Sequence, residues 1–128
     1  MIDKRNSVWV DLYNTLFLVS SNYGEIKHLE SPIFEVLDEL ETVLYTAFRL
    51  DVLNQFQENG WIDEVIKTEL VQFYNHVDKI ENSRWNSIDF DNYEDWVIAK
   101  KWAKSLMNKL NMDRQGWDST GSTVIYLD

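Results

Sequence analysis

Residues 7–22, SVWVDLYNTLFLVSSN, decide the fold of this chain. Apolar side chains recur there at helical spacing and extend around most of the helix: Val8, Leu12, Leu16 and Val19 on one face, flanked by Trp9, Tyr13 and Phe17. A band of this width indicates a helix that other elements surround, not one that lies half exposed on the surface. We therefore expect a mainly α-helical protein with a central helix over about 7–22, ended by Gly24.

The rest of the chain predicts three more helices, at about 32–58, 61–80 and 91–111. Ser31 and Pro32 give the second helix a hydroxyl cap followed by a proline, which favours a first helical turn. An unbroken apolar stripe would place Asp51 in the core, and a buried unpaired carboxylate is costly. We expect a break near residue 51, with Asp51 capping a short new segment; a buried Asp51 with a partner is the alternative.

The C-terminal residues differ in character from the rest. The segment 123–127 is rich in β-branched and aromatic side chains, which predicts a short strand with residues 87–90 as a guessed partner. The expected fold is therefore a mainly α, four- to five-helix bundle with a short C-terminal β element. Its 128 residues are the usual size of one domain, so we expect a single helical domain over 1–128.

Composition limits the class of protein. Hydrophobic residues make up 45% of the chain and aromatic residues 14%, which excludes intrinsic disorder despite a net charge of −10. No apolar run is long enough to span a membrane, and Asp11 and Asn14 interrupt the N-terminal apolar stretch, which favours a helix over a signal peptide. The chain has no cysteine, so disulfide and thiolate chemistry are excluded and a cytoplasmic location is expected.

The charge is unevenly distributed along the chain. Residues 30–99 hold sixteen acids and four bases, a net charge of −12, whereas residues 100–114 hold five bases and one acid, a net charge of +4. Such a surface repels nucleic acid and anionic lipid and attracts basic proteins. We expect no direct binding to nucleic acid or to a membrane; solubility alone is the alternative reason for the acidity.

Residues 85–96, WNSIDFDNYEDW, place four carboxylates among five large apolar side chains. A calcium loop that starts at Asp89 fails, because Glu94 stands where the sharp turn needs glycine and Lys100 where the loop needs a bidentate glutamate. Asp91 and Glu94 have the spacing of a capping box, so a helix is expected to begin near Asp91.

The aromatic residues of the same stretch have two interpretations. Phe90 and Trp96 fit a core contact beside the helix start, whereas Trp85 and Tyr93 are expected to be half-buried. The half-buried rings either complete the core or form part of a binding face, because rings and carboxylates together complement the Lys and Arg of a partner.

The sequence contains no motif for catalysis or metal binding. His28 and His76 have no second histidine or carboxylate at zinc-ligand spacing. Neither a phosphate loop nor a G-x-S-x-G elbow occurs. We therefore expect a protein that is not an enzyme and needs no metal or cofactor.

Small size, absence of cysteine, a net charge of −10 and abundant Trp and Tyr together resemble the immunity proteins that bacteria make against their own nuclease toxins. The resemblance implies an inhibitor that binds a basic partner, a cognate toxin nuclease, in a fixed ratio. The same character is similar to phage inhibitors that mimic nucleic acid, such as some anti-CRISPR proteins. A structural or adaptor subunit without inhibitory activity is a third interpretation.

Two surfaces are candidates for binding the partner. Nucleases that grip phosphate carry Lys and Arg in their clefts, and carboxylates on a rigid helical scaffold can occupy such a cleft. The candidate residues are Glu35, Asp38 and Glu39 on the second helix, and Trp85, Asp89, Asp91, Tyr93, Glu94 and Asp95.

Overall fold

The computed structural model describes residues 5–31 and 35–121, and these ranges form seven α-helices and two short 3-10 helices. The α-helices are α1 (Ser7–Ser20), α2 (Tyr23–Ile26), α3 (Val36–Ala47), α4 (Leu50–Glu58), α5 (Glu64–Asp78), α6 (Ser87–Asn92) and α7 (Glu94–Lys109). The 3-10 helices are η1 (Lys27–Leu29) and η2 (Asn82–Arg84). The prediction of a mainly helical protein is confirmed, whereas the count of four to five helices is wrong.

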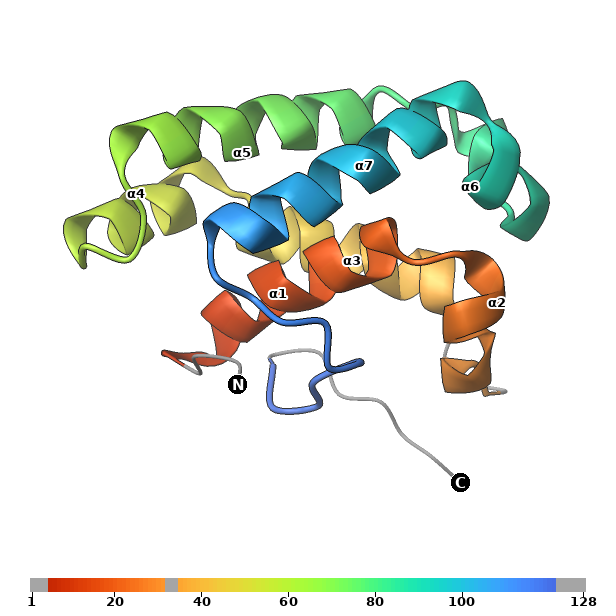
Figure 1. Ribbon diagram of the computed structural model, residues 1–128, viewed down its shortest axis with the longest axis horizontal. Coiled ribbons are helices and arrows are strands. Elements are labelled where there is room, and N and C mark those ends of the chain that lie inside the picture. Colours follow the sequence, from red (N-terminus) through yellow and green to blue (C-terminus); the bar gives the residue numbers. More distant parts are fainter. Residues whose placement is uncertain (1–4, 32–34, 122–128) are drawn as a thin grey trace.

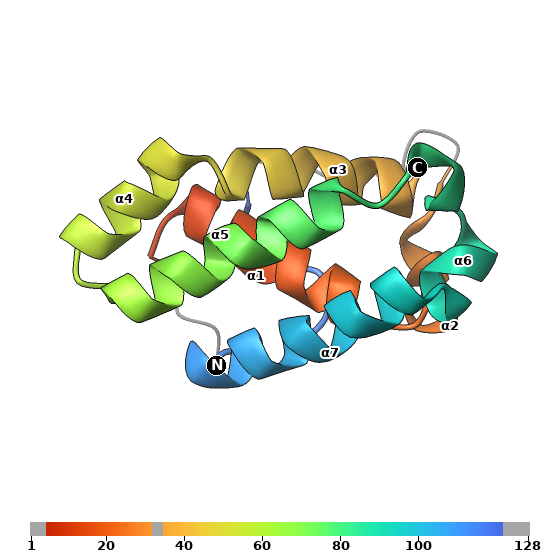
Figure 2. The same ribbon diagram turned by 90° about the horizontal axis from the view of Figure 1, so that it is seen from above.

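The longer helices are packed around α1. Helix α3 lies along one side of α1 and α7 along the other, with α5 crossing above them (Figures 1 and 2). Helix α4 lies at one end of this group, and the short helices α2 and α6 lie together at the other. In the part of the chain that the structure describes, no helix is long and apolar enough to cross a membrane.

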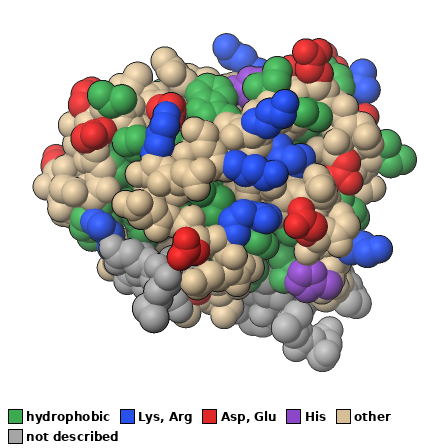
Figure 3. All heavy atoms as spheres, viewed as in Figure 1, with side chains coloured by type: hydrophobic (Ala, Val, Ile, Leu, Met, Phe, Trp, Pro, Cys, Tyr) green, Lys and Arg blue, Asp and Glu red, His purple; other side chains and the backbone are tan. Residues whose placement is uncertain are grey.

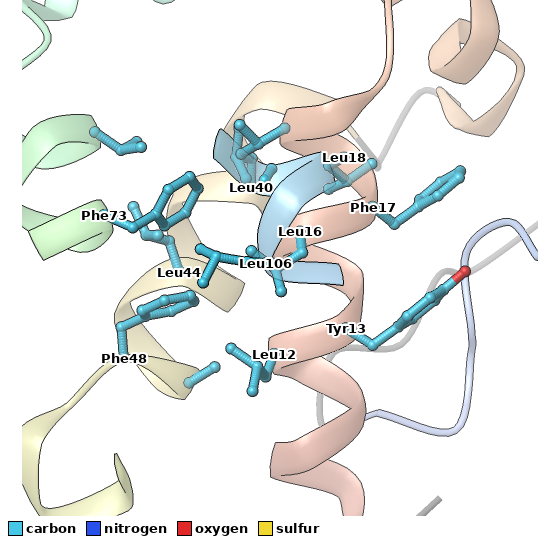
Figure 4. Packing of buried hydrophobic residues seen from close by; sticks show 14 of the residues in the cluster. Leu12, Tyr13, Leu16, Phe17, Leu18, Leu40, Leu44, Phe48, Phe73 and Leu106 are labelled. Carbon is cyan, nitrogen blue, oxygen red and sulfur yellow. The ribbon is translucent and has the colours of Figure 1, made fainter. Parts of the chain in front are cut away.

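Helix α1 is buried on all sides, so the prediction of a central helix is confirmed. Every residue from 9 to 21 is buried. Figure 4 shows Leu12 and Leu16 directed at leucines of α3 and α7 and at Phe73 of α5. Full burial of a leucine contributes roughly 1.5–3 kcal/mol. The helix begins at an Asn6 cap, whose side chain accepts a hydrogen bond from the Trp9 backbone N–H at 2.7 Å.

The polar side chains of α1 face the C-terminal segment, residues 113–121. Asn14 Nδ2 donates to the Asp118 carbonyl and Asn14 Oδ1 accepts from the Asp118 N–H, both at 2.9 Å. The Tyr13 hydroxyl donates to the Gly116 carbonyl and accepts from the Gln115 N–H. A Cβ at Gly121 would lie 2.5 Å from Asp11 Oδ1, so the segment approaches α1 too closely for a larger residue there. These contacts cover the last side of α1 and give the buried polar side chains of Tyr13 and Asn14 their hydrogen-bond partners.

Two cations cap the C-terminal end of α1. Lys100 Nζ donates to the Ser21 carbonyl at 2.5 Å and lies 4.5 Å from the centre of the Phe90 ring. The Arg114 guanidinium donates to the hydroxyls of Ser20 and Ser21. Carbonyls at this end have no partner within the helix and carry partial negative charge, so both cations are favourably placed. Burial lowers the pKa of Lys100, and the nearby Asp91 carboxylate partly opposes this effect.

Several predicted boundaries differ from the structure. Helix α1 ends at Ser20 and Gly24 lies inside α2, because Ser21 adopts an extended conformation. The break near residue 51 is confirmed, but α4 begins at Leu50 and the exposed Asp51 pairs with Arg49 in its first turn instead of capping it. Helix α3 begins at Val36, later than the predicted start at 32, and Pro32 lies outside the described residues.

The third predicted helix, over 61–80, is observed as the shorter α5. Its cap is Asp63, whose side chain accepts from the Ile66 N–H at 2.8 Å.

The predicted strand over 123–127 lies outside the described residues. Its guessed partner, residues 87–90, is wrong, because these residues are helical in α6 and their backbone groups bond along the helix.

Asn14→Ala tests the contact between α1 and the C-terminal segment. Removal of the side chain removes both hydrogen bonds that Asn14 makes to the buried backbone of Asp118, so the free energy of unfolding should fall by about 2–4 kcal/mol. Urea unfolding followed by circular dichroism measures the loss. The control is Asn108→Ala on the exposed side of α7, which should change stability by less than about 0.5 kcal/mol. Equal effects of the two substitutions would contradict the structural role of Asn14.

Candidate binding groove and the acidic stretch

The stretch 85–96 folds into the corner between α6 and α7. The rings of Trp85 and Trp96 meet edge to face at 4.9 Å, and Phe90 lies 5.0 Å from Trp96. Phe90 and Trp96 are buried, whereas Trp85 and Tyr93 are half-buried, as predicted. The aromatic residues of the stretch therefore form a core contact that fixes the corner between the two helices.

The helix cap in the stretch is Asn86, which begins α6. Asn86 Oδ1 accepts from the Asp89 N–H at 2.9 Å, and Asn86 Nδ2 donates to Asp89 Oδ2 at 2.7 Å. Arg84 lies 3.7 Å from the Asp89 carboxylate, and its guanidinium covers the Tyr93 ring at 4.4 Å. Asp89 and Tyr93 therefore have partners within the chain, which makes them poorer candidates for binding another protein.

The predicted capping box of Asp91 and Glu94 is wrong. Asp91 lies inside α6, and its Oδ1 accepts from the Tyr23 N–H at the start of α2 at 2.7 Å. The cap of α7 is Tyr93, whose side chain makes no capping hydrogen bond. Glu94 and Asp95 lie in the first turn of α7, where the helix dipole favours negative charge.

A groove lies between α3, the C-terminal end of α5 and the segment 80–85. Its volume is about 380 Å³. Aromatic and acidic side chains define its character: Tyr45, Tyr74 and Trp85, with Glu41 and Asp78. Trp85 is the only one of the predicted binding residues that lines it. Tyr45 is 67% exposed, which is unusual for so large a ring, and it also borders the neighbouring hollow beside Leu50.

In the part of the chain that the structure describes, the groove carboxylates have no cation of their own. Neither Glu41 nor Asp78 has a lysine or arginine nitrogen within 4 Å in the described ranges. Burial raises the pKa of the Tyr74 hydroxyl, and Asp78 and Tyr45 raise it further. Tyr74 therefore remains a protonated hydrogen-bond donor at neutral pH beside the Asp78 carboxylate.

The predicted acidic surface of Glu35, Asp38 and Glu39, which we call the α3 ridge, lies next to this groove. Glu35 is the exposed N-cap of α3, and Asp38 and Glu39 occupy its first turn. Glu41 follows Asp38 by three residues, so the two lie on adjacent turns of the same helical face. Burial raises the pKa of Glu39, and the neighbouring Asp38 carboxylate adds to this effect. The α3 ridge thus extends the negative charge of the groove toward the start of α3.

The basic side chains lie mostly elsewhere. Figure 3 shows Lys and Arg side chains gathered over the face on which α7 lies. Lys109 pairs with Glu69 at 2.8 Å, and Lys100 and Arg114 bind the end of α1. None of the residues that line the groove comes from α7. The structure therefore separates a basic strip on α7 from the acidic groove between α3 and α5.

Comparison with known proteins provides no further assignment. No protein-family model, curated protein or solved structure matches this chain. Within the described residues, no three His, Asp or Glu side chains are grouped as metal ligands would be.

Of the aromatic and acidic residues that line the groove, four were not predicted from the sequence: Glu41, Tyr45, Tyr74 and Asp78. The first two follow Asp38 at the third and seventh positions, so helical periodicity could have extended the α3 ridge to them. Tyr74 and Asp78 have the same four-residue spacing on α5. Their closeness to α3 had no signal in the sequence, because it depends on how α3 and α5 cross.

Asp91→Ala and Glu94→Ala test which acids of the stretch 85–96 stabilise the fold and which lie only on its surface. Loss of Asp91 removes a charge-assisted hydrogen bond to the first turn of α2 and the carboxylate beside Lys100, so stability should fall by about 1–3 kcal/mol. Glu94 is exposed and should contribute less than about 0.5–1 kcal/mol. Thermal unfolding of both variants measures the difference, and an equally small effect of Asp91→Ala would contradict its role.

Proposed function

We propose that this protein is an immunity protein, an inhibitor that binds and neutralises a basic partner, a cognate bacterial toxin nuclease, in a one-to-one complex. The observation that supports this proposal is the groove in which Glu41 and Asp78 lie among aromatic rings without a cation from the described chain. The partner would supply the missing positive charge.

The chemistry of nucleases supports this choice of partner. Enzymes that bind phosphate do so largely through lysine and arginine side chains. Carboxylates held on two helices present negative charge to those side chains in place of the nucleic acid. Occupation of the nuclease cleft would exclude its substrate and would require no reaction by the inhibitor.

The net charge supports rapid capture. A charge of −10 attracts a basic protein over distances up to the Debye length, about 8 Å at 0.15 M salt, and increases the association rate. Exposed Tyr45 and half-buried Trp85 offer apolar area to be covered in the complex, which slows dissociation. The two effects together favour tight binding at physiological salt.

The experiment reverses the groove charges and compares them with matched charges elsewhere. Glu41→Lys with Asp78→Lys changes the groove, and Glu58→Lys with Glu64→Lys makes the same change in net charge on α4 and the start of α5. The wild-type protein should retain one basic protein from the source-cell lysate at about 0.15 M salt and abolish its nuclease activity at a one-to-one ratio. The groove variant should bind about 100-fold more weakly because it loses two charge pairs, whereas the control should stay within about threefold.

Three results would contradict the proposal: no protein retained at 0.15 M salt, a retained protein whose activity is not inhibited, or equal weakening by the two variants. The last result would mean that net charge alone drives association. The groove substitutions are suited to this test because they leave intact Asp91 and Asp89, which hold α2 and Arg84 in place.

A further inference from the structure

Two arginines of the chain have the same kind of surroundings, since each lies against one aromatic ring and near one carboxylate. Arg84 lies over the Tyr93 ring at 4.4 Å and 3.7 Å from the Asp89 carboxylate. Arg114 lies over the Phe17 ring at 5.2 Å and 3.9 Å from Glu25. A guanidinium is planar, so it can stack on a ring while its edge donates to a carboxylate.

The groove between α3 and α5 contains the same parts without the arginine. Three aromatic side chains and two carboxylates line it, and none of the described residues that line it is lysine or arginine. The carboxylates come from different helices, Glu41 from α3 and Asp78 from α5. The arrangement matches the internal arginine sites in composition and lies open on the surface.

We propose that this groove is the anchor site for one arginine side chain of a basic partner protein. The guanidinium lies against the aromatic lining and donates hydrogen bonds to Glu41 and Asp78. This inference takes the basic partner from the proposed function and adds the side chain that the partner must insert.

Arginine fits the groove better than lysine for a chemical reason. A guanidinium has five N–H donors in one plane and is weakly hydrated, so it can bond two carboxylates while it covers a ring. A lysine ammonium is compact and strongly hydrated, and it would have to lose more of its hydration to reach the same groups. The exposed ring of Tyr45 favours the planar cation, since stacking covers its face.

The test uses the full chain and two short peptides, Ac-Gly-Arg-Gly-NH2 and Ac-Gly-Lys-Gly-NH2, at constant ionic strength. Two-dimensional ¹H–¹⁵N NMR follows each titration through the Trp85 indole N–H and the backbone amides of 41–46 and 74–82. The arginine peptide should give saturable shifts confined to these groups, with a dissociation constant on the order of 1–10 mM. The lysine peptide should bind at least about threefold more weakly.

Matched variants assign the binding to the groove. Tyr45→Ala should weaken the arginine peptide by about threefold, and Glu41→Gln with Asp78→Asn by about tenfold. Val65→Ala, which removes a side chain that is 75% exposed on α5, and Glu58→Gln with Glu64→Gln should each stay within about twofold. All substituted side chains are on the surface or line the groove, and unchanged amide dispersion verifies the fold of each variant.

The inference is overturned by shifts that do not saturate or that spread over all acidic residues, by equal binding of the two peptides, or by groove variants that match their controls. These results are separate from those that test the proposed function. If the groove binds arginine but no toxin is inhibited, the immunity function is wrong and the arginine site stands. If a toxin is inhibited but the peptides fail these criteria, only the arginine site is wrong.

Discussion

Burial of α1 on every side from Trp9 onward is the constraint on which the rest of the structure depends. A helix covered on every side must have a hydrogen-bond partner for each polar side chain and for its end carbonyls, because water cannot reach them. Helices α3, α5 and α7 bury its apolar side chains (Figure 4). The C-terminal segment 113–121 pairs with Tyr13 and Asn14, and the cations of Lys100 and Arg114 bind its C-terminal end. The N-terminal helix and the C-terminal segment, far apart in sequence, therefore depend on each other.

The same constraint helps to explain the distribution of charge. Lys100 and Arg114 are held by the end of α1, Arg84 by Asp89 and Tyr93, and Lys109 by Glu69. These cations are not available to neutralise the carboxylates between α3 and α5. Among the described residues, Glu41 and Asp78 of the groove lie beside aromatic rings without an internal cation, and it is there that we propose a basic protein binds.

Helical periodicity predicted the parts of the fold that depend on local sequence. The central position of α1 follows from the spacing of apolar residues, the break near residue 51 from the cost of burying Asp51 in that spacing, and the burial of Phe90 and Trp96 from their places beside a helix start. The short helices α2 and α6 were missed, because each spans fewer residues than a periodic pattern needs and each is stabilised by distant groups such as the Asp91–Tyr23 contact. The groove was only partly predicted for the same reason. Trp85 was identified, and so were the α3 acids next to the groove, but Glu41 and Tyr45 were not, and Tyr74 and Asp78 reach α3 only through the packing of α5.

The central claim is that the groove between α3 and α5 is the surface that meets the partner. Amide hydrogen exchange measured on the protein alone and on its one-to-one complex with the captured partner tests this claim most directly. We predict that the complex slows exchange over residues 41–46 and 74–85 and leaves the exposed face of α7 unchanged. Protection confined to α7 or to residues 87–95, with the groove exchanging as in the free protein, would contradict it.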